Sequence, residues 1–171
     1  MNESLHYALF PTSMGWVGAL ASPRGLRKLT LPVATPDQAQ RELGKEAAGA
    51  EEAPQRFDAL QQQVEAFFQG ERTQFDVPLD TEGHSPFFSR AWRACASIPA
   101  GETRSYAWLA AQAGSPLAVR AAGQAMARNP LPLIIPCHRV VGSDGGLHGY
   151  GGGLPMKERF LDMERRHAVQ G

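Results

Sequence analysis

Residues 105–128 read SYAWLAAQAGSPLAVRAAGQAMAR, and this stretch determines which fold class the second half of the chain belongs to. Ser105 suits the N-cap of a helix, and Gly114 is of the type that commonly ends one. Ser115-Pro116 then predicts the start of another helix, which runs to about Arg128. Two short helices joined by a glycine-containing turn are typical of a helix-turn-helix.

Further helices are expected on both sides of this stretch. Ser85-Pro86 predicts a helix that runs to about Ile98. Trp92 and Cys95 lie three residues apart on its apolar side, so Cys95 is predicted to be a core residue. Residues 156–164 form the final predicted helix.

The first half contains short apolar runs separated by glycine and proline, which predict strands joined by hairpins. The predicted strands are residues 7–10, 16–20, 26–31 and 75–79; residues 36–53 predict a short helix and then a loop, and residues 55–69 an amphipathic helix. The expected fold class is therefore an α/β N-terminal domain at residues 1–82, with a small antiparallel sheet and helices. A mainly α C-terminal domain with the helix-turn-helix follows at residues 83–171.

The totals exclude several classes of protein. No run of about 18 apolar residues occurs, which argues against a membrane span. The N-terminal residues lack the basic and apolar regions of a signal peptide. Two cysteines, Cys95 and Cys137, in a chain without a signal predict free thiols and a cytoplasmic location. Two cysteines and scattered histidines make a poor zinc site, so no metal is expected.

The formal net charge is zero, yet the charges are unevenly distributed. Residues 1–88 contain seven basic and twelve acidic side chains, whereas residues 89–171 contain ten and five. A neutral total can therefore hide a basic surface in the second half, which suits a nucleic-acid partner. Ordinary solvated charge gives the same counts.

Residues 136–141, Pro-Cys-His-Arg-Val-Val, place a cysteine directly beside a histidine. Because a free thiol ionises at a pH of about 8.5, a neighbouring imidazole is the usual means of activating it. The apolar run at residues 131–135 predicts a buried segment that holds the thiol rigidly. The alternative is a buried cysteine next to a surface histidine.

Residues 135–141 resemble the active-site signature of the O6-alkylguanine-DNA alkyltransferases. The resemblance extends from Phe87 to Glu164 through residues 101–106, 121–126, 129–130 and 149–154, in the family's order and spacing. It implies DNA repair by direct, irreversible, single-turnover transfer of the alkyl group from O6-alkylguanine to Cys137, with O4-alkylthymine as a second candidate substrate. No cofactor is implied.

The resemblance also implies roles for four catalytic residues. Cys137 is the nucleophile, and His138 takes the thiol proton through a water. Glu164 orients the imidazole, and Tyr106 lies beside the flipped base, where its hydroxyl can donate a hydrogen bond to the departing purine. Taken alone, Tyr106 reads as a core tyrosine and Glu164 as a solvent-exposed carboxylate.

The predicted helix at residues 115–128 has an unusual surface. Val119, Ala122 and Met126 are predicted to face the core. The opposite side carries mostly small residues around Arg120 and Gln124. Small residues would let the helix backbone approach DNA closely, although an alanine-rich helix can also reflect helix propensity alone. The resemblance implies docking in the minor groove of duplex DNA with little sequence specificity.

The remaining implied contacts fall into two sets. Arg120 fills the space left by the flipped nucleotide, and the other predicted DNA contacts are Tyr106, Ser115, Gln124, Ala127 and Ser143. The predicted substrate pocket comprises Met126, Asn129, Val140, Tyr150, Gly151 and Lys157. The protein is expected to act as a monomer on DNA that contains alkylated guanine, without a membrane partner.

Two other functions stay open. A binding module that only flags alkylated guanine would lack the nucleophile, so Cys137 argues against it. A Cys-His hydrolase acting on small substrates would need an oxyanion-hole motif, which we do not recognise in the sequence, and would not need the helix-turn-helix.

Overall fold

The computed structural model describes residues 4–170 of the chain. The chain divides into two compact units, Met1–Thr81 and Glu82–Gly171. The opening residues, in which no signal peptide is expected, lie partly outside the described range. Within residues 4–170, no helix is both long and apolar enough to cross a membrane.

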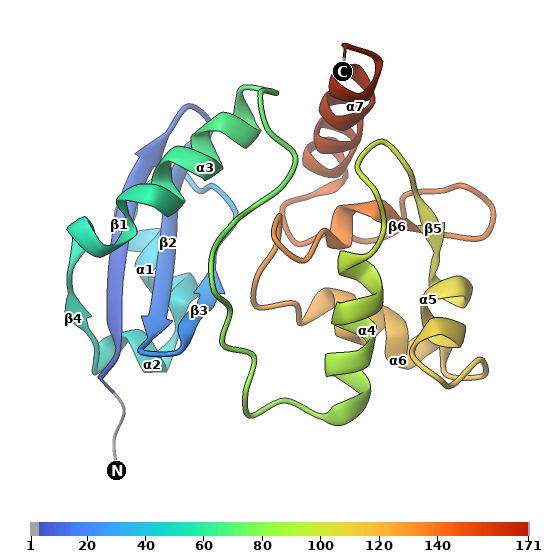
Figure 1. Ribbon diagram of the computed structural model, residues 1–171, viewed down its shortest axis with the longest axis horizontal. Coiled ribbons are helices and arrows are strands. Elements are labelled where there is room, and N and C mark those ends of the chain that lie inside the picture. The colour runs from blue at the N-terminus through green and yellow to red at the C-terminus, as the bar shows by residue number, and fades with distance from the viewer. Residues whose placement is uncertain (1–3, 171) are drawn as a thin grey trace. The chain divides into compact units, whose positions relative to one another are not determined.

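The first unit is built on a four-stranded sheet. Its strands are β1 (His6–Thr12), β2 (Gly15–Ser22), β3 (Gly25–Leu29) and β4 (Glu51–Glu52), in the order β3-β2-β1-β4. The three longer strands pair antiparallel, which confirms the predicted hairpins. The sheet is nevertheless mixed, because β4 pairs parallel with β1 (Figure 1).

Helices cover both faces of this sheet (Figure 1). On one face, α1 (Pro36–Leu43) and α2 (Lys45–Ala48) bury Leu43 and Ala47 against Leu20. A Cβ atom on Gly18 would lie 3.0 Å from the Leu43 side chain, so glycine lets α1 approach the strand closely. On the other face, α3 (Asp58–Phe68) follows the 3-10 turn η1 (Pro54–Phe57) and buries the apolar side predicted from its sequence.

Two predictions for the first unit are wrong. Residues 75–79 do not form a strand: Leu79 makes only an isolated bridge to Leu26. Pro78 lacks an N–H to donate to a ladder, and its carbonyl accepts from Leu26 N at 2.8 Å. The loop predicted after the first helix instead contains α2 and β4.

A buried carboxylate fastens the end of this unit to its sheet. The Asp80 side chain is 0% exposed, accepts a hydrogen bond from Ser22 Oγ at 2.5 Å and lies 3.2 Å from Arg27 Nη1. Arg27 also lies 3.0 Å from Glu46 of α2. Sheet, helix and the following segment therefore share one polar network.

The second unit is mainly helical, as predicted. Its helices are α4 (Pro86–Ala96), α5 (Tyr106–Gln112), α6 (Val119–Ala127) and α7 (Leu154–Gln170). Between them lie the 3-10 turn η2 (Cys137–Arg139) and two short parallel strands, β5 (Arg104–Ser105) and β6 (Val140–Val141). The Ser85 hydroxyl accepts a hydrogen bond from Phe88 N at 3.1 Å, which confirms the predicted N-cap of α4.

The helix-turn-helix consists of α5 and α6. Ser105 caps α5 by accepting from Trp108 N at 3.0 Å. The predicted start of α6 at Ser115 is wrong, because Ala118 N bonds to Ser115 O in an isolated turn and the helix begins at Val119. Val119 is 40% exposed, so its predicted core position is also wrong.

The buried side of α6 packs against α4. Ala122, Ala125 and Met126 are buried, and Trp92 Nε1 donates to the Ala125 carbonyl at 2.8 Å.

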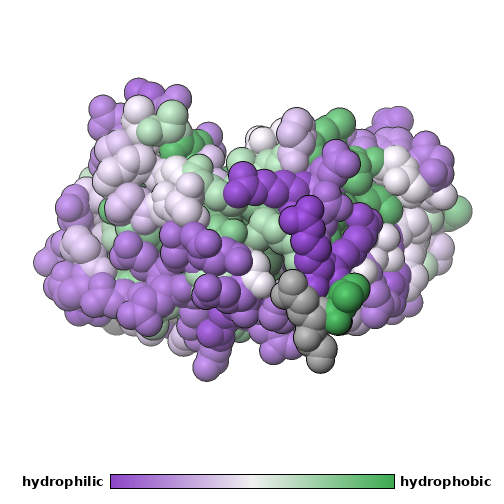
Figure 2. Space-filling view, turned by 90° about the horizontal axis from the view of Figure 1, so that it is seen from above, coloured by the Kyte–Doolittle hydropathy of each residue, from purple (hydrophilic) through white to green (hydrophobic). Residues whose placement is uncertain are grey.

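On the face of the molecule shown in Figure 2, hydrophilic side chains predominate and apolar ones appear in small groups.

Candidate active site

Cys137 lies at the start of η2, after a largely buried segment. Leu131, Leu133 and Ile135 are at most 3% exposed, and Cys137 N donates to Ile135 O at 2.7 Å. Leu133 has a φ of 75°, a left-handed conformation that leucine rarely adopts. The segment that leads to the thiol is therefore buried, as its apolar sequence predicts.

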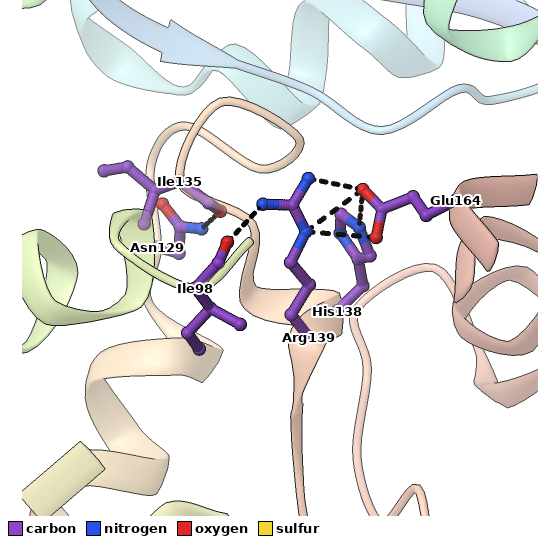
Figure 3. A network of polar contacts seen from close by, with 6 residues as sticks. All are labelled: Ile98, Asn129, Ile135, His138, Arg139 and Glu164. Carbon is purple, nitrogen blue, oxygen red and sulfur yellow. Dashed lines mark hydrogen bonds and ion pairs between the residues drawn. The ribbon is translucent and has the colours of Figure 1, made fainter. Parts of the chain in front are cut away.

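Asn129 closes the loop that leads to this segment (Figure 3). Its Nδ2 donates to the Ile135 carbonyl at 2.7 Å, and its Oδ1 accepts from Leu131 N at 2.8 Å. Burial raises the pKa of Cys137, and the Asn129 side chain opposes this effect by favouring the thiolate. Asn129 thus stabilises the loop through two hydrogen bonds and also affects the Cys137 thiol.

The two cysteines are free thiols with different surroundings. Cys95 lies in α4 and is 0% exposed, and burial raises its pKa well above the ordinary value. Cys137 is 8% exposed. Burial also raises the pKa of Cys137, but Asn129, Lys157 and backbone N–H groups oppose that effect. Cys137 is therefore buried less completely than Cys95, and it is protonated at rest.

His138, the residue after Cys137, forms a buried pair with Glu164. His138 Nε2 lies 2.9 Å from Glu164 Oε2, and the two side chains are 0% and 1% exposed. Burial lowers the pKa of His138, although the Glu164 carboxylate acts to raise it. The imidazole is accordingly neutral at neutral pH and able to accept a proton.

The inward direction of Glu164 follows from α7. Phe160, four residues earlier, and Lys157, seven residues earlier, are 0% exposed, so the three share the buried face of this helix. Burial acts to raise the pKa of Glu164, but hydrogen bonds from His138 and Arg139 outweigh it, so the pKa is lowered. The carboxylate is ionised.

Arg139 is a residue that the sequence reasoning missed. It is 6% exposed, and its guanidinium contacts both carboxylate oxygens of Glu164 and donates to the Ile98 carbonyl at 2.7 Å (Figure 3). The only available signal was its place next to the Cys-His pair, and arginines are seldom so deeply buried.

Lys157 is a buried cation on the first turn of α7. Its Nζ donates to the carbonyls of Leu147 and Gly149 at 2.6 and 3.1 Å, and lies 5.8 Å from the centre of the Tyr106 ring. Burial lowers the pKa of Lys157, and its charge in turn favours the thiolate of Cys137. Lys157 therefore links the loop after β6 to the surroundings of the sulfur.

Two tyrosines complete the buried surroundings. Burial and the nearby Cys137 raise the pKa of Tyr106, the first residue of α5. They raise the pKa of Tyr150 further, and its buried hydroxyl has no hydrogen-bond partner within residues 4–170. Both phenols are thus protonated and near the sulfur, and Tyr150 has an O–H available to donate.

The predicted site residues fall into three groups. The structure brings Asn129, His138, Lys157, Tyr106 and Tyr150 into the surroundings of Cys137, with Glu164 behind His138. A second group is exposed: Arg120, Gln124 and Ala127 on α6, and Ser143 and Gly151 in the loops between β6 and α7. The remaining residues are less accessible: Ser115 is half-buried in the turn before α6, and Met126 and Val140 are buried. No described contact joins the exposed group to the thiol.

Within residues 4–170, no three His, Cys, Asp or Glu side chains are grouped to hold a metal ion. The second unit combines a helix-turn-helix that has an exposed face with a buried cysteine followed by a neutral imidazole. This combination indicates a DNA-binding protein whose chemistry depends on a cysteine.

Comparisons with known proteins agree with this class. Residues 86–166 match the family described as 6-O-methylguanine DNA methyltransferase, DNA binding domain. A methylated-DNA–protein-cysteine methyltransferase of Mycolicibacterium paratuberculosis is 50% identical over 120 residues, which cover 70% of this chain and 72% of that protein. The constitutive enzyme of that name from Bacillus subtilis is 48% identical over 115 residues, or 67% and 68% of the two chains.

Solved structures extend the similarity to the first unit. The crystal structure of Mycobacterium tuberculosis OGT in complex with DNA matches with a TM-score of 0.81 and 37% identity, over 95% of this chain and 94% of that one. The O6-methylguanine-DNA methyltransferase of Pyrococcus kodakaraensis matches with a TM-score of 0.68 and 25% identity, over 94% and 98%. The chain belongs to the methylated-DNA–protein-cysteine methyltransferase family, which confirms the resemblance seen in the sequence.

Proposed function

We propose that this protein repairs DNA by moving the alkyl group of O6-alkylguanine onto its own Cys137. The single observation that supports this most strongly is that the residue after Cys137 in η2, His138, carries a buried, neutral imidazole in contact with the Glu164 carboxylate. A protonated thiol needs a base before it can attack, and a neutral imidazole is that base.

The reaction balances within these groups. His138 accepts the Cys137 proton, by the route through a water that the family resemblance implies. The thiolate sulfur then forms a bond to the alkyl carbon, and the bond from that carbon to guanine O6 breaks with its electron pair on the guanine. The thiol proton ends on the purine ring. Because a thioether sulfur is a poor leaving group, each protein molecule reacts once.

Tyr106 assists the departing guanine in this proposal. Its pKa is raised by burial, so its phenol keeps the proton that it donates as a hydrogen bond to the purine. Loss of one positioned hydrogen-bond donor of this kind typically lowers the rate by about 10²–10³-fold. The substrate pocket is formed by Met126, Asn129, Val140, Tyr150, Gly151 and Lys157. O4-alkylthymine is a second candidate substrate.

The exposed face of α6 docks in the minor groove, and the damaged nucleotide is flipped out. Arg120 is exposed on this face, and its planar guanidinium can stack in the space left behind. Flipping costs a few kcal/mol, and less for a base that pairs poorly, so an alkylated guanine is selected in this way. Ser115 and Ser143 contact DNA phosphates, and Gln124 and Ala127 are further DNA contacts. Binding has little sequence specificity.

The remaining parts of the proposal concern the setting. The protein works as a cytoplasmic monomer and without a cofactor. The second unit carries both DNA binding and chemistry, and its helix-turn-helix and thiol lie in one compact body.

A stoichiometric titration tests the function. The protein is incubated with increasing amounts of a duplex that contains O6-methylguanine, and transferred methyl is counted by intact mass. We expect a plateau at one methyl per protein and none for Cys137→Ala, which should still bind the duplex. Continued release of repaired duplex beyond one per protein, without an adduct, contradicts the proposal.

A further inference from the structure

One carboxylate in the second unit, that of Glu164, contacts both the Arg139 guanidinium and the His138 imidazole. Arg139 Nε lies 3.0 and 3.1 Å from the two Glu164 oxygens, and its Nη2 lies 2.5 Å from Oε2. The same Oε2 lies 2.9 Å from His138 Nε2 (Figure 3). All three side chains are at most 7% exposed, so no bulk solvent screens them.

The total charge of this buried group decides the state of the imidazole. Buried charges are tolerated when they are paired, which favours a group whose charges sum to zero. The Arg139 guanidinium is always charged, and Glu164 is ionised. With these two present, the sum is zero when His138 is neutral. Without Arg139, it would be zero when His138 carries a proton.

We propose that Arg139 is a positioning residue that neutralises Glu164 and thereby keeps His138 uncharged and ready to accept the Cys137 proton. That His138 accepts the Cys137 proton during repair rests on the proposed function. The charge state of His138 is a property of the free protein and can be measured without DNA.

Other groups around the imidazole act in known directions. From α7, Glu164 raises the pKa of His138 and Lys157 lowers it; from η2, Arg139 lowers it. The uncharged Phe160 ring packs edge-on at 5.6 Å. Glu164 is therefore the group that favours imidazolium, and Arg139 is the group in direct contact with that carboxylate.

The test is an NMR titration of the histidine side chains of the free protein. The chain has five histidines, and the His138→Gln variant assigns the relevant signal. In Arg139→Gln the titration midpoint of His138 should rise by about one pH unit or more. The reason is that the negative charge of Glu164 is no longer neutralised by Arg139 and therefore favours the imidazolium. Arg139→Lys keeps the charge and should stay near the wild-type midpoint. The pH dependence of methyl transfer should move in the same direction as the midpoint.

A second variant decides the matter if Arg139→Gln does not fold. Glu164→Gln leaves the guanidinium without its carboxylate, so the His138 midpoint should fall below that of the wild type. An unchanged His138 midpoint in Arg139→Gln, even with slow transfer, would mean that Arg139 is only structural and would overturn the proposal. An unchanged or raised His138 midpoint in Glu164→Gln would overturn it as well. A wild-type protein that forms no methyl adduct would refute the proposed function and leave the titration as a separate result.

Discussion

The two units both bury charge, but they use it differently. In the first unit, Asp80 is fully buried and its partners, Ser22 and Arg27, belong to the sheet that it fastens. In the second unit, the buried ionisable side chains are His138, Arg139, Lys157 and Glu164, and Lys157 acts on the Cys137 thiol. Buried ionisable groups grouped around a potential nucleophile mark a functional site, whereas a single paired carboxylate is structural.

The largest expected effect comes from removing the nucleophile of the second unit. Cys137→Ser should lower methyl transfer by about a thousandfold or more, since a hydroxyl is a far weaker nucleophile at neutral pH. DNA affinity should be unchanged, because α6 is a separate element. Single-turnover kinetics and a binding titration measure the two. Cys95→Ala is the control and should transfer normally; slow transfer in that variant alone would reverse the assignment.

The next effect separates the exposed face of α6 from the buried group. Arg120→Ala should slow transfer from duplex DNA by about a hundredfold and leave transfer from a free O6-benzylguanine base nearly unaffected, because nothing has to be flipped in the free base. Arg93→Ala, which removes an exposed arginine from α4, is the matched control. Equal losses on both substrates would show that Arg120 supports the fold.

A change in the first unit should affect stability alone. Asp80→Ala removes a fully buried carboxylate from Ser22 and Arg27 and should lower the free energy of unfolding by about 2 kcal/mol. The transfer rate per folded molecule should stay the same. Denaturant titration and single-turnover kinetics measure both quantities, with the exposed Asp76→Asn as the control. A slower transfer in folded Asp80→Ala would contradict the division of roles.

Acid should weaken the second unit through its buried group. The pKa of His138 is lowered from 6.5 by burial, so the unfolded chain takes up the proton first as pH falls. Its stabilising contribution is complete above pH 6.5 and declines below it. The pKa of Glu164 is lowered from 4.5, so its contribution is present above pH 4.5 and declines at lower pH.

Denaturant titrations at a series of pH values measure this decline, and hydrogen exchange assigns it to the second unit. The His138→Gln variant should lose the part that begins near pH 6.5. Constant or rising stability as the pH falls from 7 to 5 would show that His138 is not held neutral.

The smallest effect concerns phosphate contacts. Leu117 is 99% exposed in the turn before α6. Leu117→Lys should steepen the dependence of log affinity on log salt by about 0.9, the value for one further phosphate contact on duplex DNA. Gln69→Lys adds the same charge to the first unit and should leave the slope unchanged. Binding measured at several salt concentrations on two unrelated duplexes provides the slopes, and equal slopes for both variants would argue against α6 as the docking face.

Much of the fold follows from local sequence signals. Ser85 and Ser105 cap helices as predicted, and the apolar spacing of residues 57–68 gives a buried helix face. The predictions that are wrong depend on contacts between distant residues. Whether residues 75–79 pair as a strand depends on which edge of the sheet they meet, and Val119 is exposed because α6 begins later than its serine and proline suggest.

The site was predictable to the extent that its residues lie in motifs. The Cys-His pair and the family resemblance indicated Cys137, His138 and Glu164, and the structure places the last two 2.9 Å apart. The burial of Arg139 was not predictable, since its partner Glu164 lies 25 residues away and local spacing does not reveal a shared carboxylate. The contact between Lys157 and the Leu147 carbonyl likewise depends on the path of a loop.

The most direct test of the account is to map the alkyl group after a single reaction. Wild-type protein is incubated with an equimolar duplex that contains O6-methylguanine, digested, and sequenced by mass spectrometry. We expect one methyl on the peptide that contains Cys137 and none on the peptide that contains Cys95. A methyl group on Cys95, or repaired DNA with both cysteines unmodified, would contradict the claim that the buried group of the second unit activates Cys137.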